Sequence, residues 1–216
     1  MDIGHRELQL HLNSQYYCLA LDKLDLISQT MRAALNKYSR VFMVRFDVHL
    51  PRLNLKYSPK IYDSAVIDRF IDYLKGTIQK GSFPQGCKRK QTYPSKMFYV
   101  WSRHYSDADT DHYHVVIFLN HDVCSHLGDF SVHGYSLNTK IVEAWACALE
   151  LDSDSTKFLV DYPEDTPVYY LNRNAKKFPQ TFDKAFFRLS YLAKLGTKHY
   201  EDRMHSFGCS KVLDSH

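Results

Sequence analysis

The segment 111–119, with the sequence DHYHVVIFL, limits the fold of this chain because its β-branched and aromatic residues are typical of a β-strand. Successive side chains of a strand point to opposite faces, so His112 and His114 share one face, while Tyr113 and Ile117 share the other. One strand can thereby present two imidazoles to a single metal ion. The spacing alone is weak, since 12 histidines in 216 positions give about 0.7 such pairs by chance. The alternative to a metal site is that the two histidines are simply exposed to solvent at the end of a strand.

Residues 97–104, MFYVWSRH, predict a second strand. The polar segment 105–111 that follows has the length of a connection between antiparallel strands. In the resulting hairpin His104 lies near the histidine pair, and it is our candidate for the third ligand of a metal ion. Three carboxylates are substitutes for it in that role: Asp109, Asp111 and Asp47.

A third strand is predicted at residues 41–50, which end at Pro51. Its apolar side chains alternate with polar ones, which indicates a half-buried strand. The polar face carries three groups that are capable of chemistry: Arg45, Asp47 and His49. An ordinary solvent-exposed sheet face would give the same pattern.

Helical spacing of apolar residues marks four other parts of the chain. Residues 7–38 predict one or two helices, and we expect an N-terminal helical arm over 1–39 that either packs on the rest of the chain or serves as an interaction surface. Further helices are expected over 61–79, 136–150 and 181–194, the last with Thr181 as its N-cap and Gly196 after its end. Short strands are expected at 157–160 and 167–171. In the polar tail Phe207-Gly208 suggests a turn.

The composition, 44% hydrophobic over 216 residues, is sufficient for one globular core. No run of about 18 apolar residues is present, and the charged first twelve residues argue against a signal peptide, so we expect neither a membrane span nor secretion. Five cysteines without a CxxC pair suggest free thiols in a reducing compartment. These features predict a cytoplasmic protein.

The net charge of +4, with a pI near 8.7, is mildly basic. Lys88, Arg89 and Lys90 form a basic cluster flanked by glycines and prolines, which indicates a loop. Such a loop could contact nucleic-acid phosphates. A solvated loop that binds nothing is the alternative.

The last expected helix contains Tyr191 and Lys194, which are neighbours on a helix because they are three residues apart. A neutral phenol is a poor nucleophile, and a nearby cation would assist it. The same spacing occurs at Tyr57 and Tyr93, where a proline inside the motif argues against a helix. Tyr191 could instead be a structural aromatic that packs its helix on the sheet.

The order of these motifs resembles that of the HUH endonuclease superfamily of replication initiators. The resemblance is closest to the rolling-circle initiators of filamentous phages (inoviruses) and to their prophage relatives with the YagK/YfjJ C-terminal domain. The matching segments are FDVHLP at 46–51, YVWSR at 99–103, HYH at 112–114, SYLAK at 190–194 and FGCS at 207–210.

The resemblance implies an α+β fold of the HUH or Rep type, ferredoxin- or RRM-like, with flanking helices on a central antiparallel sheet. It places the histidine strand in the middle of the sheet and the tyrosine helix beside it. The implied domain covers 40–211, after the N-terminal arm, with a short tail at 212–216.

The implied function is a rolling-circle replication initiator that nicks single-stranded origin DNA. His112, His114 and the third ligand would hold Mg²⁺ or Mn²⁺, and the single Tyr191 would form a 5′-phosphotyrosyl link with help from Lys194. The DNA contacts are assigned to the polar strand face and the basic cluster: Arg45, Asp47, His49, Lys88, Arg89 and Lys90. Aromatics such as Trp101 and Tyr113 could add stacking. Trp101 suits a core position as well. A host helicase and polymerase are the expected partners. The chain has no helicase signature such as GxxxxGK[ST], so unwinding of the DNA would have to come from a partner.

His104 is a departure from the relatives, which tend to carry an acidic residue near this position. A site of three histidines would prefer softer ions than Mg²⁺.

Two rival functions remain open. One is a DNA-binding regulator of the same fold without cleavage, and the other is a metal-dependent phosphodiesterase or RNase in which Tyr191 is structural.

Overall fold

The computed structural model describes residues 19–51, 65–80, 95–104, 111–128, 136–194 and 206–211. Along the chain the elements are α2 (Leu21–Lys37), β1 (Arg40–His49), α3 (Val66–Gln79), β2 (Phe98–His104), β3 (His112–Asn120), α4 (Leu137–Leu149), α5 (Ser153–Thr156), η3 (Lys157–Leu159), β4 (Val160–Asp161), β5 (Val168–Asn172), α6 (Phe178–Ser190), η4 (Tyr191–Ala193) and β6 (Phe207–Cys209). The fold is α+β, as expected.

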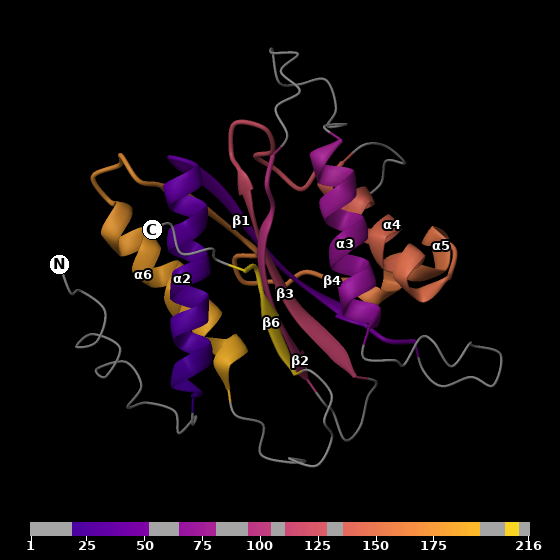
Figure 1. The fold of residues 1–216 in the computed structure, drawn as a ribbon. Helices are drawn as coiled ribbons and strands as arrows, with labels where there is room; N and C mark the ends of the chain where they lie inside the picture. The colour runs from indigo at the N-terminus through magenta and orange to yellow at the C-terminus, as the bar shows by residue number, and fades with distance from the viewer. Residues whose placement is uncertain are drawn as a thin grey trace.

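The described strands form one antiparallel sheet in the order β4-β1-β3-β2-β6, and β5 pairs with β1 beside β4. The strand β3 lies between β1 and β2 (Figure 1). Its residues Val115, Val116, Ile117 and Phe118 are all fully buried, because helices cover both faces of the sheet. The three predicted long strands are therefore confirmed, and the histidine pair begins the central one.

The two faces of the sheet have separate cores. In Figure 1, α3 and α4 lie on one side of the sheet and α2 and α6 on the other. Tyr113, Val115 and Ile117 pack in the core under α3 and α4, whereas Val116 and Phe118 pack under α2 and α6. By alternation, the side chains of His112 and His114 belong to the α2/α6 face.

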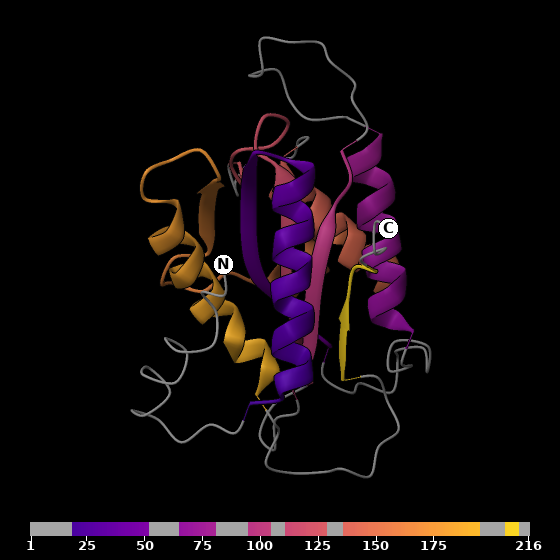
Figure 2. The ribbon, with the colours of Figure 1, turned by 60° about the vertical axis from the view of Figure 1, so that its left-hand side comes forward.

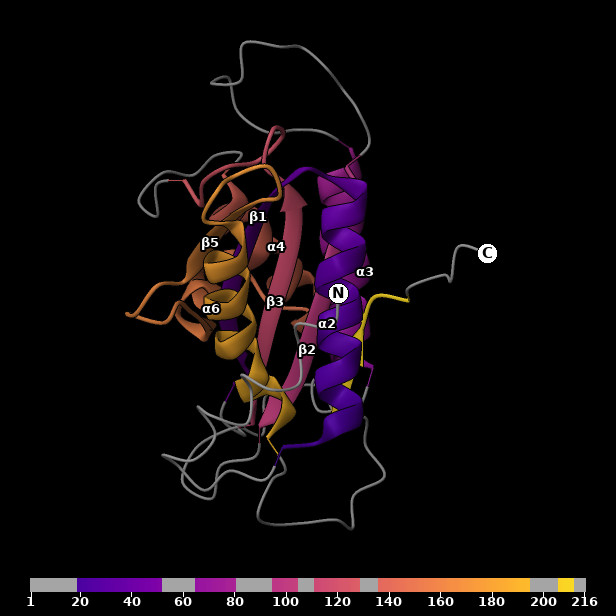
Figure 3. The ribbon, with the colours of Figure 1, turned by 90° about the vertical axis from the view of Figure 1, so that its left-hand side faces the viewer.

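The helix α2 belongs to the second core. Ile27, Met31 and Ala34 are fully buried against the sheet and α6, and the helix runs along the strands in Figures 2 and 3. The described part of the expected N-terminal arm thus packs on the sheet, which answers the question that the sequence left open. No helix within the described ranges is long and apolar enough to cross a membrane.

The helix α6 begins three residues earlier than predicted, so the assignment of Thr181 as its N-cap is wrong. Pro179 lies in the first turn, where its fixed φ favours a helix. The Thr181 hydroxyl donates to the carbonyl of Lys177 instead of capping the helix. After Ser190 the chain tightens into the 3₁₀ turn η4, and Gly196 lies outside the described residues.

Two short elements also differ from expectation. Residues 157–159 are a 3₁₀ turn rather than a strand, because they continue α5, whose N-cap Asp152 accepts a hydrogen bond from the amide of Ser155 at 2.8 Å. The turn predicted at Phe207-Gly208 is wrong as well, since these residues belong to β6 and pair with β2. A glycine is required there because Gly208 faces the ring of Trp101 across the ladder.

We expect Gly208→Ala to lower the free energy of unfolding by about 1–3 kcal/mol. An ideal Cβ at Gly208 would lie 2.6 Å from Cε2 of Trp101, a ring that is 4% exposed and cannot turn away. Gly76→Ala in α3 is the matched control, because a Cβ there meets nothing within 4 Å and alanine favours a helix. Urea denaturation of the two variants tests the difference. Equal stabilities would contradict the packing argument.

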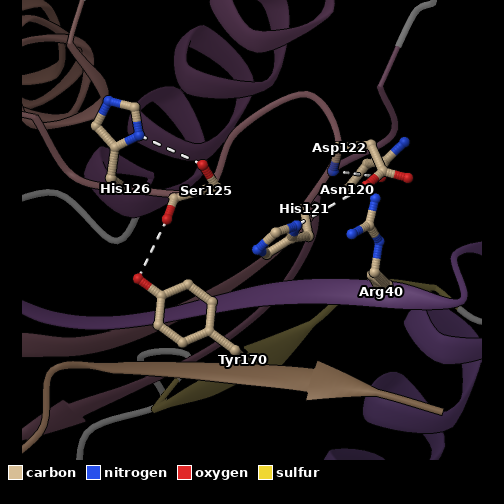
Figure 4. Close-up of polar contacts among 7 residues, drawn as sticks. All are labelled: Arg40, Asn120, His121, Asp122, Ser125, His126 and Tyr170. Carbon is tan, nitrogen blue, oxygen red and sulfur yellow. Dashed lines mark hydrogen bonds and ion pairs between the residues drawn. The ribbon is translucent and has the colours of Figure 1, made fainter. Parts of the chain in front are cut away.

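At the end of the sheet where β1 begins, polar contacts tie the chain after β3 to its neighbours (Figure 4). Arg40 forms an ion pair with Asp122, and the Tyr170 hydroxyl donates to the carbonyl of Ser125 at 3.2 Å. His121 also lies here, edge-on to the Tyr170 ring. This end of the sheet is opposite the histidine pair, which begins β3.

Candidate functional site

Strand register places the polar side chains of β1, β3 and β2 in two rows on the α2/α6 face. We name them the imidazole row, which contains His49, His112 and His104, and the carboxylate row, which contains Asp47, His114 and Ser102. Members of each row are directly opposite one another on neighbouring strands, and the rows are two residues apart along each strand. Alternation therefore points both rows to the same side of the sheet.

The rings of the imidazole row lie side by side. Their centroids are 4.9 Å apart between His49 and His112 and again between His104 and His112. Burial, followed by the charges of His114, His49 and His104, lowers the pKa of His112 to about 4. His112 is therefore neutral at physiological pH, which leaves a ring nitrogen lone pair for a metal ion.

Asp47, His112 and His114 form a candidate metal group. One potential ligand atom from each lies within 4.8 Å of the others. Among the described residues, this is the group of three histidine, cysteine or carboxylate side chains that lie close enough together to share a metal ion. Burial would raise the pKa of Asp47, but the hydrogen bond with His114 Nδ1 at 2.8 Å and the charges of His114 and Arg45 lower it below its ordinary value. The carboxylate is thus ionised and oriented toward the pair.

The structure thus groups Asp47, rather than His104, with the histidine pair. His104 borders the group, with its ring centroid 5.7 Å from that of His114. Of the remaining substitutes, Asp111 makes an ion pair with Arg103 at 2.7 Å, and Asp109 lies outside the described residues. His49, predicted to contact nucleic acid, has its Nε2 3.2 Å from a carboxylate oxygen of Asp161 on β4.

We expect Asp47→Asn to weaken Mn²⁺ binding by more than about tenfold, and by more than His104→Ala does. The amide keeps the size of the carboxylate but loses its charge, whereas His104 lies outside the three-residue group. Isothermal titration calorimetry on the two variants measures the difference. A larger loss for His104→Ala would return His104 to the role of third ligand.

The turn η4 holds Tyr191 and Lys194 against the same face. Leu192 and Ala193 are buried in the α2/α6 core, and the amide of Ala20 donates to the carbonyl of Ala193 at 2.9 Å. Tyr191 remains 37% exposed, and the Lys194 Nζ lies 3.9 Å from its ring centroid. The predicted proximity of the two side chains is confirmed, on a 3₁₀ turn rather than on a continuous α-helix.

Arg45 connects the tyrosine turn to the metal group. It lies two residues before Asp47 on the same face of β1, and its half-buried guanidinium has a pKa lowered by burial. The charges of Asp47, Arg188 and Tyr191 all act on it, and its buried Nε has no hydrogen-bond partner among the described residues. The pKa of Lys194 is likewise lowered by burial and then by the charge of Arg45. The histidine pair and the pair Tyr191 and Lys194, which the sequence analysis found separately, thus lie at one site.

Other predicted contacts are not at this site. Trp101 and Tyr113 are buried under α3 and α4, with ring centroids 5.8 Å apart, which confirms the core position suggested for Trp101 and leaves neither ring able to stack on DNA. Alternation turns both side chains away from the histidine face. The basic cluster, Lys88, Arg89 and Lys90, lies outside the described residues. Arg188 was missed, although it lies only three residues before Tyr191.

Comparisons with known proteins match nearly the whole chain. The model of the YagK/YfjJ C-terminal domain family matches residues 5–210. The uncharacterized protein YagK of Escherichia coli strain K12 is 31% identical over 182 residues, which cover 82% of this chain and 86% of the relative. The uncharacterized protein YfjJ of the same strain is 32% identical over 196 residues, which cover 87% and 92%. No solved structure gives a significant match.

Proposed function

The chain belongs to the YagK/YfjJ C-terminal domain family, and on that premise we propose that it initiates rolling-circle DNA replication by nicking a single-stranded origin through Tyr191. One observation carries this proposal. The group Asp47, His112 and His114 lies on the same sheet face as a half-exposed tyrosine, and Arg45 is under the electrostatic influence of both Asp47 and that tyrosine.

The metal group suits a divalent cation. One carboxylate oxygen with two imidazole nitrogens fits Mn²⁺ better than Mg²⁺, which prefers oxygen ligands throughout. When bound, the ion supplies Lewis-acid polarisation of the scissile phosphate. The hydrogen bond from His114 Nδ1 to Asp47, at 2.8 Å, fixes the orientation of both side chains before an ion arrives.

The other side chains act on the phosphodiester directly. The Arg45 guanidinium donates to a non-bridging oxygen of the scissile phosphate. The Tyr191 oxygen attacks the phosphorus and loses its proton. The new oxygen–phosphorus bond replaces the bond from phosphorus to the 3′ oxygen, which leaves as a hydroxyl after taking up a proton. Lys194, at 3.9 Å from the ring centroid, stabilises the negative charge that develops on the phenol.

The proposal is tested by incubating the protein with labelled single-stranded DNA from the intergenic region of its own genetic element, with and without Mn²⁺. We expect a labelled band at the size of the protein on a denaturing gel, and we expect EDTA to remove it. Cleaved DNA without an attached protein would instead indicate a hydrolase. DNA binding without cleavage, over several origin candidates and metal ions, would indicate a regulator that does not cut.

A further inference from the structure

The outward side of α6 leads directly to Tyr191. We define the α6 stripe as Lys184, Phe187 and Tyr191, three exposed residues spaced three and four apart. Phe187 is 52% exposed, although most large apolar side chains of the described residues are buried. Tyr191 itself has helical dihedral angles, φ −58° and ψ −29°, so the stripe continues without a break from α6 into η4. Lys194 extends the stripe beyond the tyrosine ring.

This part of the chain also carries its excess positive charge. Residues 176–194 contain five lysines and arginines and one aspartate, so their net charge of +4 equals that of all 216 residues. The remainder of the chain is neutral overall. Two of the cations, Lys184 and Lys194, lie on either side of the aromatic pair, while Arg188 acts electrostatically on Arg45. A surface with this charge attracts a polyanion.

We propose that the α6 stripe is a binding track for single-stranded DNA and that a base next to the attacked phosphate stacks on Phe187. Residues four apart on a helix are separated by about 6 Å along its axis, so such a base comes within reach of the ring. Cations that flank exposed aromatics hold single strands by charge and stacking, with little dependence on sequence. The inference rests on the proposed function, because the position of the phosphate at Tyr191 defines where the base lies.

A second exposed aromatic provides a control for this inference. Phe158 on η3 is 77% exposed, and the Lys157 Nζ lies 5.1 Å from its ring centroid. The pair thus offers a cation and an aromatic ring that is more exposed than that of Phe187. It follows α5, which lies on the opposite side of the sheet from α6 in Figure 1. Phe158→Ala should therefore leave DNA binding unchanged.

The experiment measures binding by fluorescence anisotropy in EDTA, so that no cleavage occurs. The probes are a labelled oligothymidylate of about 12 nucleotides and an abasic strand of the same length, which has the phosphates without the bases. We expect Phe187→Ala to weaken oligothymidylate binding by about tenfold and to leave binding of the abasic strand unchanged. Phe187→Trp should restore the affinity, because it restores a stacking surface. Equal losses on both probes, or no loss on either, would overturn the stacking assignment.

The outcome is separable from that of the nicking assay. If no adduct forms but Phe187→Ala weakens only the base-dependent binding, the track stands and the nickase proposal fails. If the adduct forms and Phe187→Ala changes neither binding nor adduct yield, the track fails and the nickase proposal stands. Thermal melting of each variant shows whether it is folded. If Phe187→Ala is unfolded, the affinities of Phe187→Trp for the two probes decide whether a base stacks at this position.

Discussion

Tyr191→Phe is expected to reduce the yield of the covalent protein–DNA adduct by at least about a thousandfold. The substitution removes only the attacking oxygen and keeps the ring, which is 37% exposed and has the Lys194 Nζ 3.9 Å from its centroid. Stability and binding of single-stranded DNA should therefore remain close to those of the unmodified chain. The measurement is the labelled-adduct gel in Mn²⁺, with a melting curve for each protein.

Tyr169→Phe is the matched control for this prediction. Tyr169 on β5 is the second tyrosine whose charge acts on Arg45, so it tests whether any phenol near that guanidinium can react. The control should keep the adduct. An adduct that survives Tyr191→Phe and disappears with Tyr169→Phe would assign the nucleophile to Tyr169 on β5. An adduct that survives both substitutions would exclude both tyrosines as the nucleophile.

His112→Ala is expected to weaken Mn²⁺ binding by more than about 100-fold and to remove cleavage together with it. His112 occupies the centre of the imidazole row and belongs to the three-residue metal group, so its loss leaves only Asp47 and His114 as ligands. The side chain is half-buried at the end of a strand, and we therefore expect the fold to survive. Calorimetry with Mn²⁺ and the adduct gel measure the two effects.

His121→Ala controls for the general loss of an imidazole. His121 lies just past the other end of β3, beside Tyr170, and has no place in the metal group. It should retain both metal binding and cleavage. If His112→Ala kept the Mn²⁺ affinity of the unmodified chain, the metal would have to bind elsewhere, and the role assigned to His112 in the metal group would fail.

Much of the fold was predictable because alternation and helical spacing are local signals. The strand at 112–119 and its two neighbours were found from the order of apolar and polar residues. The strand β6 was not found, since three residues around a glycine carry no periodicity. It is a strand because it pairs with β2, and the Trp101 ring leaves room only for a glycine at position 208 of that pair. That requirement appears only when the two segments are side by side.

The site was predictable in its parts but not in its assembly. The sequence gives the face of each side chain, whereas the register between strands decides which side chains meet. Asp47 pairs with His114 because β1 and β3 align in this register, and a shift of one residue would have turned Asp47 away. Arg45 likewise acquires its role only from the tyrosine turn that α6 brings to it.

The hydrogen bond between Ala20 and Ala193 has a consequence for the order in which the site is made. Translation proceeds from the N-terminus and adds about 5–20 residues each second, so α2 is synthesised before the described strands of the sheet. The turn that carries Tyr191 is synthesised after β1, β2 and β3, and it docks on a helix that precedes all three strands in the chain. The residues of the candidate metal group therefore leave the ribosome before Tyr191, which can join them only after α6 and η4 have been made.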